Sequence, residues 1–202
     1  GSLGANTTAN YNTGLGYNAG AAVTTGRENI LIGALAGDAL TDADENIAIG
    51  VNALGVDTLG SGAVAIGNGA LSTQNFASAT TNYNTGVGYR AGYVVSTGVR
   101  NTLIGSLAGD AITDADFNTV LGFNALTTNT VGSKSVAIGS EALHTQNPAS
   151  ATDMFNVGVG HQAGYAVTTG TQNTLIGGLA GDALTTGSYN TALGSYCLSA
   201  DD

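Results

Sequence analysis

Proline, tryptophan, cysteine and charged residues are all scarce in this chain. Its 202 residues include one proline, one cysteine and no tryptophan, and only 9% of them are Asp, Glu, Lys or Arg. The single cysteine, Cys197, excludes an internal disulfide. So little proline excludes a collagen helix, and a hydrophobic fraction of 43% with so little charge argues against a disordered chain.

Basic residues are the scarcest charged class. Four Lys and Arg residues against 14 Asp and Glu residues give a net charge of −10, which argues against nucleic acid and anionic membrane surfaces as partners. The chain also lacks an apolar run of about 18 residues, so no membrane insertion is expected. It has no nucleophile elbow and no isolated phosphate-binding loop, so we expect no enzyme, no catalytic residue and no cofactor.

What the chain does contain is glycine and internal repetition. The strings NYNTGLGYNAG from Asn10, NYNTGVGYRAG from Asn82 and MFNVGVGHQAG from Met154 start 72 residues apart. We therefore divide a single repeat domain, 1–202, into cycles at 10–81, 82–153 and 154–202, the third incomplete. Gly1-Ser2 is typical of a cloning scar, and we expect the array to be a piece of a longer one.

Each cycle contains smaller units of the form N-x-x-φ-G-x-x-A-[GL], where φ is Ile, Leu or Val. The motif glycines recur at spacings of 17, 17, 17 and 21 residues, and they are Gly16, Gly33, Gly50, Gly67, Gly88, Gly105, Gly122, Gly139, Gly160, Gly177 and Gly194. An aliphatic residue precedes every one of these glycines. Alanine follows three residues later in every unit except the last, which has Cys197.

This pattern predicts an all-β fold, a parallel β-solenoid (β-roll) of eleven coils of 17/17/17/21 residues. A run as short as NTLIG cannot bury its apolar residues alone, whereas stacked coils turn each position into a continuous ladder. Recurring glycine disfavours helices. Alternation predicts that Thr102 and Ile104 point to one side of a strand and Leu103 to the other. The small residue at the alanine position allows close approach, inside the coil or across a subunit interface.

Two families resemble this pattern. AVAIGNGAL (Ala63 to Leu71) and SVAIGSEAL (Ser135 to Leu143) resemble the head repeats of YadA-type trimeric autotransporter adhesins, although the coils here are longer. NTGVGYRAG and NTLIGSLAG are similar to repeats of bacteriophage tail-fibre proteins. The resemblance implies a homotrimer that contacts a host-surface glycan or protein receptor. It implies localisation to the virion as a tail fibre or, alternatively, to the bacterial cell surface as an adhesin.

The four extra residues of each fourth coil must leave the stack as a loop, because the ladders on either side keep their register. These loops fall within 72–83 and 144–155 and combine aromatic side chains with Gln and Asn. Such a mixture suits glycan or protein contacts. The candidate receptor-binding residues are Gln74, Asn75, Phe76, Tyr83, His144, Gln146, Asn147 and Phe155. The alternative is that the loops shield an apolar seam or brace adjacent chains.

Acidic turns give a weaker candidate for a calcium site. Asp42 and Asp44 recur as Asp114 and Asp116, and Ca²⁺ favours several carboxylate and carbonyl oxygens. The third copy of the turn reads DALTTGSYN and has lost both acids. A solvated turn without metal is therefore the preferred interpretation.

Aromatic residues also recur with the long period. Tyr17, Tyr89 and His161 follow the motif glycine in successive cycles, and Tyr93 and Tyr165 form a second stripe. Such ladders stack on sugars in some proteins, but in β-structure they more often serve packing. We therefore expect packing. Cys197, in the alanine row, is expected to be an inert small hydrophobe.

The leading functional interpretation is a structural and receptor-binding shaft segment of a phage tail fibre. An ice-binding solenoid would need Thr in nearly every coil of one row. The best row alternates with aliphatic residues and runs Thr13, Ile30, Ile47, Val64, Thr85, Thr102, Thr119, Val136, Val157, Thr174, Thr191. A polysaccharide-cleaving solenoid would need paired carboxylates, and the acids here cluster in a turn that the third copy lacks.

Overall fold

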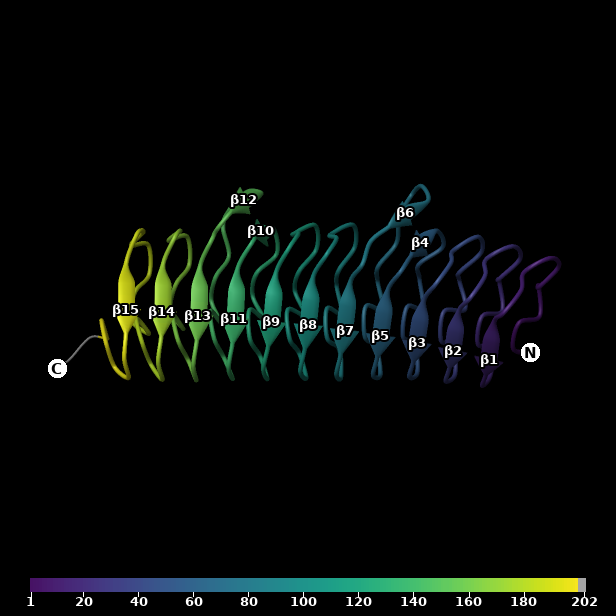
Figure 1. The fold of residues 1–202 in the computed structure, drawn as a ribbon, viewed down its shortest axis with the longest axis horizontal. Helices are drawn as coiled ribbons and strands as arrows, with labels where there is room; N and C mark the ends of the chain where they lie inside the picture. The colour runs from purple at the N-terminus through teal and green to yellow at the C-terminus, as the bar shows by residue number, and fades with distance from the viewer. Residues whose placement is uncertain (200–202) are drawn as a thin grey trace.

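The computed structural model describes residues 1–199 as a rod of stacked coils, and every regular element in that range is a β-strand (Figure 1). One three-residue strand per coil joins an eleven-stranded parallel sheet that runs the length of the rod. Its strands, in spatial order, are β1 (Thr13–Leu15), β2 (Ile30–Ile32), β3 (Ile47–Ile49), β5 (Val64–Ile66), β7 (Thr85–Val87), β8 (Thr102–Ile104), β9 (Thr119–Leu121), β11 (Val136–Ile138), β13 (Val157–Val159), β14 (Thr174–Ile176) and β15 (Thr191–Leu193). The predicted all-β parallel solenoid of eleven coils is confirmed.

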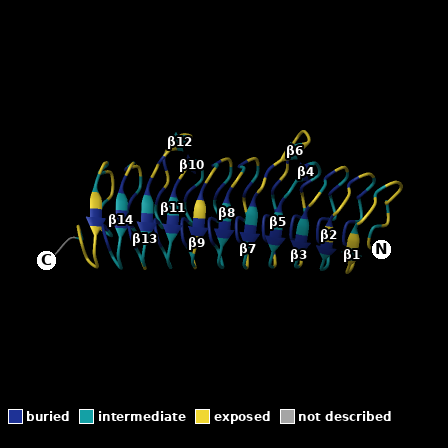
Figure 2. Ribbon diagram, in the orientation of Figure 1, coloured by how far each residue is buried: buried dark blue, intermediate teal, exposed yellow. Residues whose placement is uncertain are grey.

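The register of the sheet keeps equivalent residues in line. Thr13 pairs with Ile30, Ile30 with Ile47, and so on to Thr191, so the first residues of the strands reproduce the row read from the sequence. The middle residue of each strand points inward and the two flanking residues point outward. Leu103, for example, is fully buried, whereas Thr102 and Ile104 on either side are partly exposed (Figure 2).

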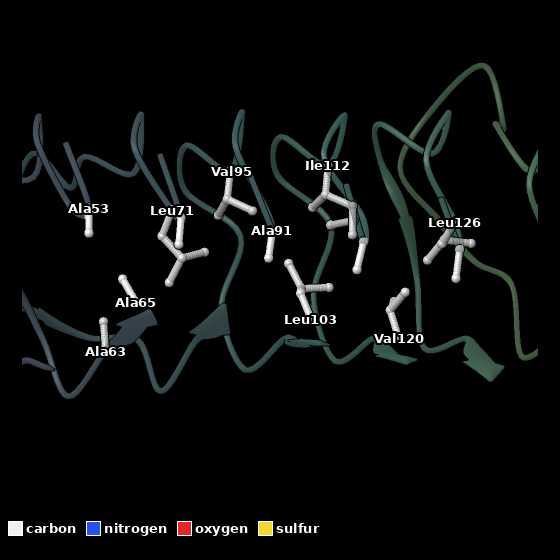
Figure 3. Close-up of a cluster of buried hydrophobic side chains, with 14 of the residues drawn as sticks. Ala53, Ala63, Ala65, Leu71, Ala91, Val95, Leu103, Ile112, Val120 and Leu126 are labelled. Carbon is white, nitrogen blue, oxygen red and sulfur yellow. The ribbon is translucent and has the colours of Figure 1, made fainter. Parts of the chain in front are cut away.

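The core inside the coils alternates large and small side chains over four coils. The coil of β7 has Gly86 where the next coil has Leu103, and Gly92 where the preceding coil has Leu71, and these two leucines fill the space left by the glycines. A Cβ on Gly92 would lie 2.6 Å from Leu103 Cδ1 and 2.8 Å from Leu71 Cδ2. Figure 3 shows Leu71, Leu103 and Leu126 lying between the strands and the opposite wall. The alternation of large and small core side chains therefore repeats every 72 residues, as the loops do.

The alanine row, from Ala19 to Ala180, lies inside the coil and is fully buried. The sequence left two locations open for this row, the coil interior and a subunit interface, and the structure places it in the coil interior. Cys197 occupies the same row in the last coil that the structure describes, and its side chain is exposed there. That it is an inert small hydrophobe stays a prediction.

A ladder of buried asparagines precedes the strands. The backbone N–H of Asn46 donates to Asn29 Oδ1 at 3.0 Å, and Asn46 Nδ2 donates to the carbonyl of Gly60 at 2.9 Å. The same pair of bonds recurs at Asn101 and Asn118. Each amide therefore satisfies buried backbone groups of the neighbouring coils, which would otherwise destabilise so narrow a fold.

The motif glycines turn the chain away from the sheet, with φ between +128° and +147°. A side chain is excluded there for a second reason, the close approach of the next coil. A Cβ on Gly105 would lie 2.6 Å from the carbonyl oxygen of Gly122. Only glycine allows this backbone stacking.

The two long coils project as predicted. In the first, β6 (Thr80–Thr81) pairs with β4 (Gly60–Ser61) of the preceding coil, and in the second, β12 (Thr152–Asp153) pairs with β10 (Gly132–Ser133). Both loops leave the rod at the same corner, the one that precedes the strands of the main sheet (Figure 1). Four coils separate them, or about 19 Å at about 4.8 Å per strand.

Candidate functional site

The outer face of the eleven-stranded sheet is a continuous and largely apolar strip of the surface. The last strand residue is Ile, Leu or Val in every coil, and the first is Thr, Ile or Val. Every one of these side chains is at least partly exposed. The most exposed aliphatic ones range from Ile30, at 38% exposure, to Leu193, at 74%. Among the described strands, those of the main sheet contact only one another, so no second layer of strands covers this face.

The face is long and narrow. Eleven strands at about 4.8 Å each give a length of roughly 50 Å, and two side-chain rows give a width on the order of 10 Å. The resulting patch of about 500 Å² lies within the range of roughly 300–600 Å² for the largest apolar patch of a typical monomer, and such a patch is often functional.

Two further rows border this face, and we name them by position. The N-edge row lies two residues before each strand, and it comprises Tyr11, Glu28, Glu45, Gly62, Tyr83, Arg100, Phe117, Lys134, Phe155, Gln172 and Tyr189. The C-edge row lies two residues after each strand, and it comprises Tyr17, Ala34, Val51, Asn68, Tyr89, Ser106, Phe123, Ser140, His161, Gly178 and Ser195. Every N-edge residue has positive φ, which turns the chain at the corner of the coil.

The rings of both rows are open to solvent, from Phe117 at 47% to Tyr11 at 83%. Within the N-edge row, cations lie over the ring of the next coil. The Arg100 guanidinium is 5.3 Å from the Phe117 ring centre, and Lys134 Nζ is 5.4 Å from that of Phe155. Lys134 also pairs with Asp153 at 2.6 Å. At such exposed sites each contact contributes on the order of 0.5–1 kcal/mol.

The loop residues singled out from the sequence separate into buried and exposed groups. Gln74 and Gln146 are fully buried and Phe76 is 6% exposed, so these three side chains pack in the interior of the single chain. Their burial argues against direct contact with a receptor, and that part of the receptor site stays a prediction. The amino-acid composition of a loop does not show whether a glutamine side chain points to solvent or back into the coil.

Gln74 and Gln146 bridge the gaps in the asparagine ladder. In the coils before the loops, Ala63 and Ser135 stand where other coils have asparagine. Gln74 Oε1 accepts a hydrogen bond from Asn84 Nδ2 at 2.8 Å, and Gln146 Oε1 accepts one from Asn156 Nδ2 at 2.9 Å. The glutamines thus replace the missing amide side chain.

The other end of each glutamine has a different partner in the two cycles. Gln74 Nε2 donates to the buried carboxylate of Asp57 at 2.7 Å, whereas Gln146 Nε2 donates to Ser135 Oγ at 3.1 Å. Asn129 takes the place of Asp57 in the second cycle. Burial raises the pKa of Asp57, and the hydrogen bonds from Gln74 and the backbone of Gly60 oppose that rise.

The remaining loop candidates stay on the surface. Asn75 and Asn147 are exposed, and their side-chain oxygens accept hydrogen bonds from the hydroxyls of Thr58 and Thr130 at 3.2 and 2.8 Å. Their amide NH₂ groups remain available to a ligand. His144 is partly buried against Tyr165, with ring centres 4.8 Å apart.

Tyr83 and Phe155 are also exposed, but the structure places them on the N-edge row rather than at the loop tips. The sequence reading missed the other N-edge rings, Tyr11, Phe117 and Tyr189. Their constant position, two residues before each strand, is the sequence signal that could have identified them.

The acidic turns connect neighbouring coils. Asp44 Oδ1 accepts a hydrogen bond from the backbone N–H of Arg27, and Asp116 Oδ1 accepts one from Val99, both at 2.7 Å. Asp42 accepts a bond from Thr25 Oγ1, and Asp114 accepts bonds from Ser96 and Thr97. No group of three or more His, Cys, Asp or Glu side chains gathers around a common point in the described part of the chain.

The second aromatic stripe packs as expected. Tyr165 stacks on His144, and Arg90 lies 4.7 Å from the ring centre of Tyr93. Tyr17 and Tyr89, by contrast, are 72% and 50% exposed, and the Arg90 guanidinium lies 5.4 Å from the ring centre of Tyr89. Among residues 1–199 there is no surface pocket and no helix long and apolar enough to cross a membrane.

No family model, no curated protein and no solved structure matches this chain.

Proposed function

We propose that this chain is a shaft segment of a homotrimeric attachment fibre of the phage-tail type, which contacts a host-surface receptor through its corner loops. One observation carries the proposal. The last strand residue, on the outer face of the sheet, is aliphatic in all eleven coils, although no second layer of strands in the described chain covers that face. Association of three rods along this face removes the patch from water.

The burial of that face is energetically adequate for association. About 500 Å² per chain, at about 25 cal/mol per Å², corresponds to on the order of 12 kcal/mol per chain before the entropic cost of association. Aliphatic and aromatic contacts of this kind are typical of obligate oligomers.

The loops support the attachment role. They project at a corner beside the apolar face rather than within it, and they recur every four coils. A trimer would therefore present three loops at each level, and a receptor with repeated epitopes would be held by several of them at once. Multivalent contact raises the overall affinity without any single strong site.

Attachment is tested with a fluorescently labelled rod on a panel of bacterial strains, read by flow cytometry. The matched variant lacks residues 77–80 and 149–152, which reduces both long coils to 17 residues and keeps Gln74, Phe76 and Gln146. We expect the rod to bind some strains and the loop-shortened variant, with an unchanged circular dichroism spectrum, to lose that binding. Equal binding by both forms would contradict the role of the loops. Binding to animal matrix proteins instead of bacteria would favour the YadA-like adhesin.

A further inference from the structure

The two edge rows match each other coil by coil. In the coil of β7, Tyr83 on the N-edge and Tyr89 on the C-edge are both tyrosine, and in the coil of β9, Phe117 and Phe123 are both phenylalanine. The first coil pairs tyrosine with tyrosine, and the coil of β13 pairs phenylalanine with histidine. All four rings of the C-edge row thus lie in coils whose N-edge also carries a ring. Tyr189 is the one N-edge ring without a C-edge counterpart.

Where the N-edge residue is a cation, the C-edge residue is small. Arg100 shares its coil with Ser106, and Lys134 shares its coil with Ser140. A ring at one edge therefore accompanies a ring at the other, and a long charged side chain accompanies a short one. This is the pattern of two surfaces in contact.

The contact is not made within one chain. The two edge residues of a coil are six positions apart on opposite sides of a strand, or up to about 20 Å in extended backbone. The one aromatic pair among residues 1–199 is His144 with Tyr165, which belongs to neither row. The matching rings are left at 47% exposure or more, apart from His161, which is also exposed.

We propose that the rods associate parallel and in register around an axis along the rod, with the C-edge row of each chain packed against the N-edge row of the next. This rests on the proposed homotrimer and specifies its interface. When three sheets face a common axis, the carboxyl end of each strand points to the amino end of its neighbour's strand. Closed rotation involves no translation, so each coil meets the same coil of the next chain.

Other arrangements fail to explain the matching. An antiparallel pair would place the first coil against the last and would give no relation between the two edges of one coil. A staggered array would relate different coils. Only in-register parallel packing makes the residue at one edge a neighbour of the residue six positions later. Ring pairs at such contacts add specificity to the burial of the aliphatic face.

The test uses cysteine pairs in a Cys197→Ala background and a short bis-maleimide cross-linker. The matched variant carries Tyr83→Cys and Tyr89→Cys, from one coil. The mismatched control carries Tyr83→Cys and Phe123→Cys, two coils or about 10 Å apart along the rod. Light scattering on the untreated proteins first establishes how many chains associate.

We expect the matched variant to give covalent species that end at three chains on a denaturing gel. The mismatched variant and each single-cysteine variant should remain single chains. An associated protein whose matched pair links no better than the mismatched pair overturns the edge-to-edge packing and leaves the proposed trimer standing. Matched species that end at two chains overturn the threefold arrangement. A wild-type protein that light scattering finds as single chains overturns the proposed function itself.

Discussion

The inward-facing and outward-facing positions of the strands differ in how much their residues vary from coil to coil. Inside, the residue in the middle of each strand varies among Gly, Ala, Val and Leu, and each choice fits the neighbouring coils. Outside, the last strand residue is aliphatic in every coil, with its equivalents in the adjacent strands beside it and no second layer of described strands over it. Variation with compensation is what a core requires. The uniformity of the outer row is the observation on which the proposed association of rods rests.

The polar interior follows the same rule of compensation. Asp57 with Ala63 in one cycle and Asn129 with Ser135 in the next each supply one acceptor for a buried glutamine. The asparagine ladder and its glutamine bridges therefore belong to folding. The outer face and its edge rows are the surfaces that the proposed association would use.

The largest effect on folding is expected from Leu103→Ala. Leu103 fills the space beside Gly92 and Gly109, and the surrounding glycines have no side chains with which to close a cavity. We expect a loss of about 2–5 kcal/mol in the free energy of unfolding, measured by denaturant titration. Ile104→Ala, one residue away on the outer face, should cost less in the folding of the single chain. Equal losses would contradict the division between the two faces.

Gly105→Ala and Gly194→Ala form a matched pair at the corner of the coil. Both glycines have φ of +132°, so the backbone strain is the same. A Cβ at position 105 would meet the Gly122 carbonyl oxygen at 2.6 Å, whereas at position 194 the nearest neighbour is Cys197 Cβ at 4.0 Å. Thermal unfolding should show Gly105→Ala to be less stable than Gly194→Ala by about 1–3 kcal/mol. A difference near zero would mean that the close stacking of backbones is not what requires glycine.

The smallest effect concerns Asp57. Because burial raises its pKa, the folded state holds the proton more tightly, and the group's contribution to stability is largest below the usual pKa of 3.8. That contribution decreases as pH rises through the raised pKa. Asp57→Asn with Ala63→Ser reproduces the second cycle and should be more stable than wild type at pH 7, with the difference shrinking toward pH 3.

The single change Asp57→Asn is the control for that experiment. Its amide N–H would face Gln74 Nε2, donor against donor, while Ala63 offers no hydroxyl. The single variant should therefore be less stable than the double variant at every pH. Melting temperatures that rank the single variant above the double variant would disprove this account of the glutamine bridge.

Much of the fold was predictable because repetition reveals register. Eleven aligned copies place Thr13, Ile30 and their equivalents in one row, and the strand pairing is the one the alignment implies. Alternation likewise predicted that Leu103 and Ile104 face opposite sides. Neither signal says which side is inside, because Ile104 is as apolar as Leu103. Only the closure of the coil decides that.

The functional site was less accessible to sequence reasoning. Gln74 and Asn75 are adjacent polar residues in one loop, yet one is buried and the other exposed. The direction of each depends on a gap in the ladder at Ala63, 11 residues earlier. The edge rows were missed for another reason. Tyr83 and Tyr89 are six residues apart on opposite sides of a strand, and their match gains a meaning only under the proposed association of rods.

The most direct test of the central claim is the mass of the protein in solution. Light scattering during size-exclusion chromatography should give three times the chain mass for the wild type. The variant Ile66→Lys, Ile104→Lys, Ile138→Lys changes only the outer face and should give the mass of one chain with an unchanged circular dichroism spectrum. A wild-type protein that elutes as a single folded chain, or a lysine variant that remains a trimer, would contradict the assignment of the outer face as the seam between chains.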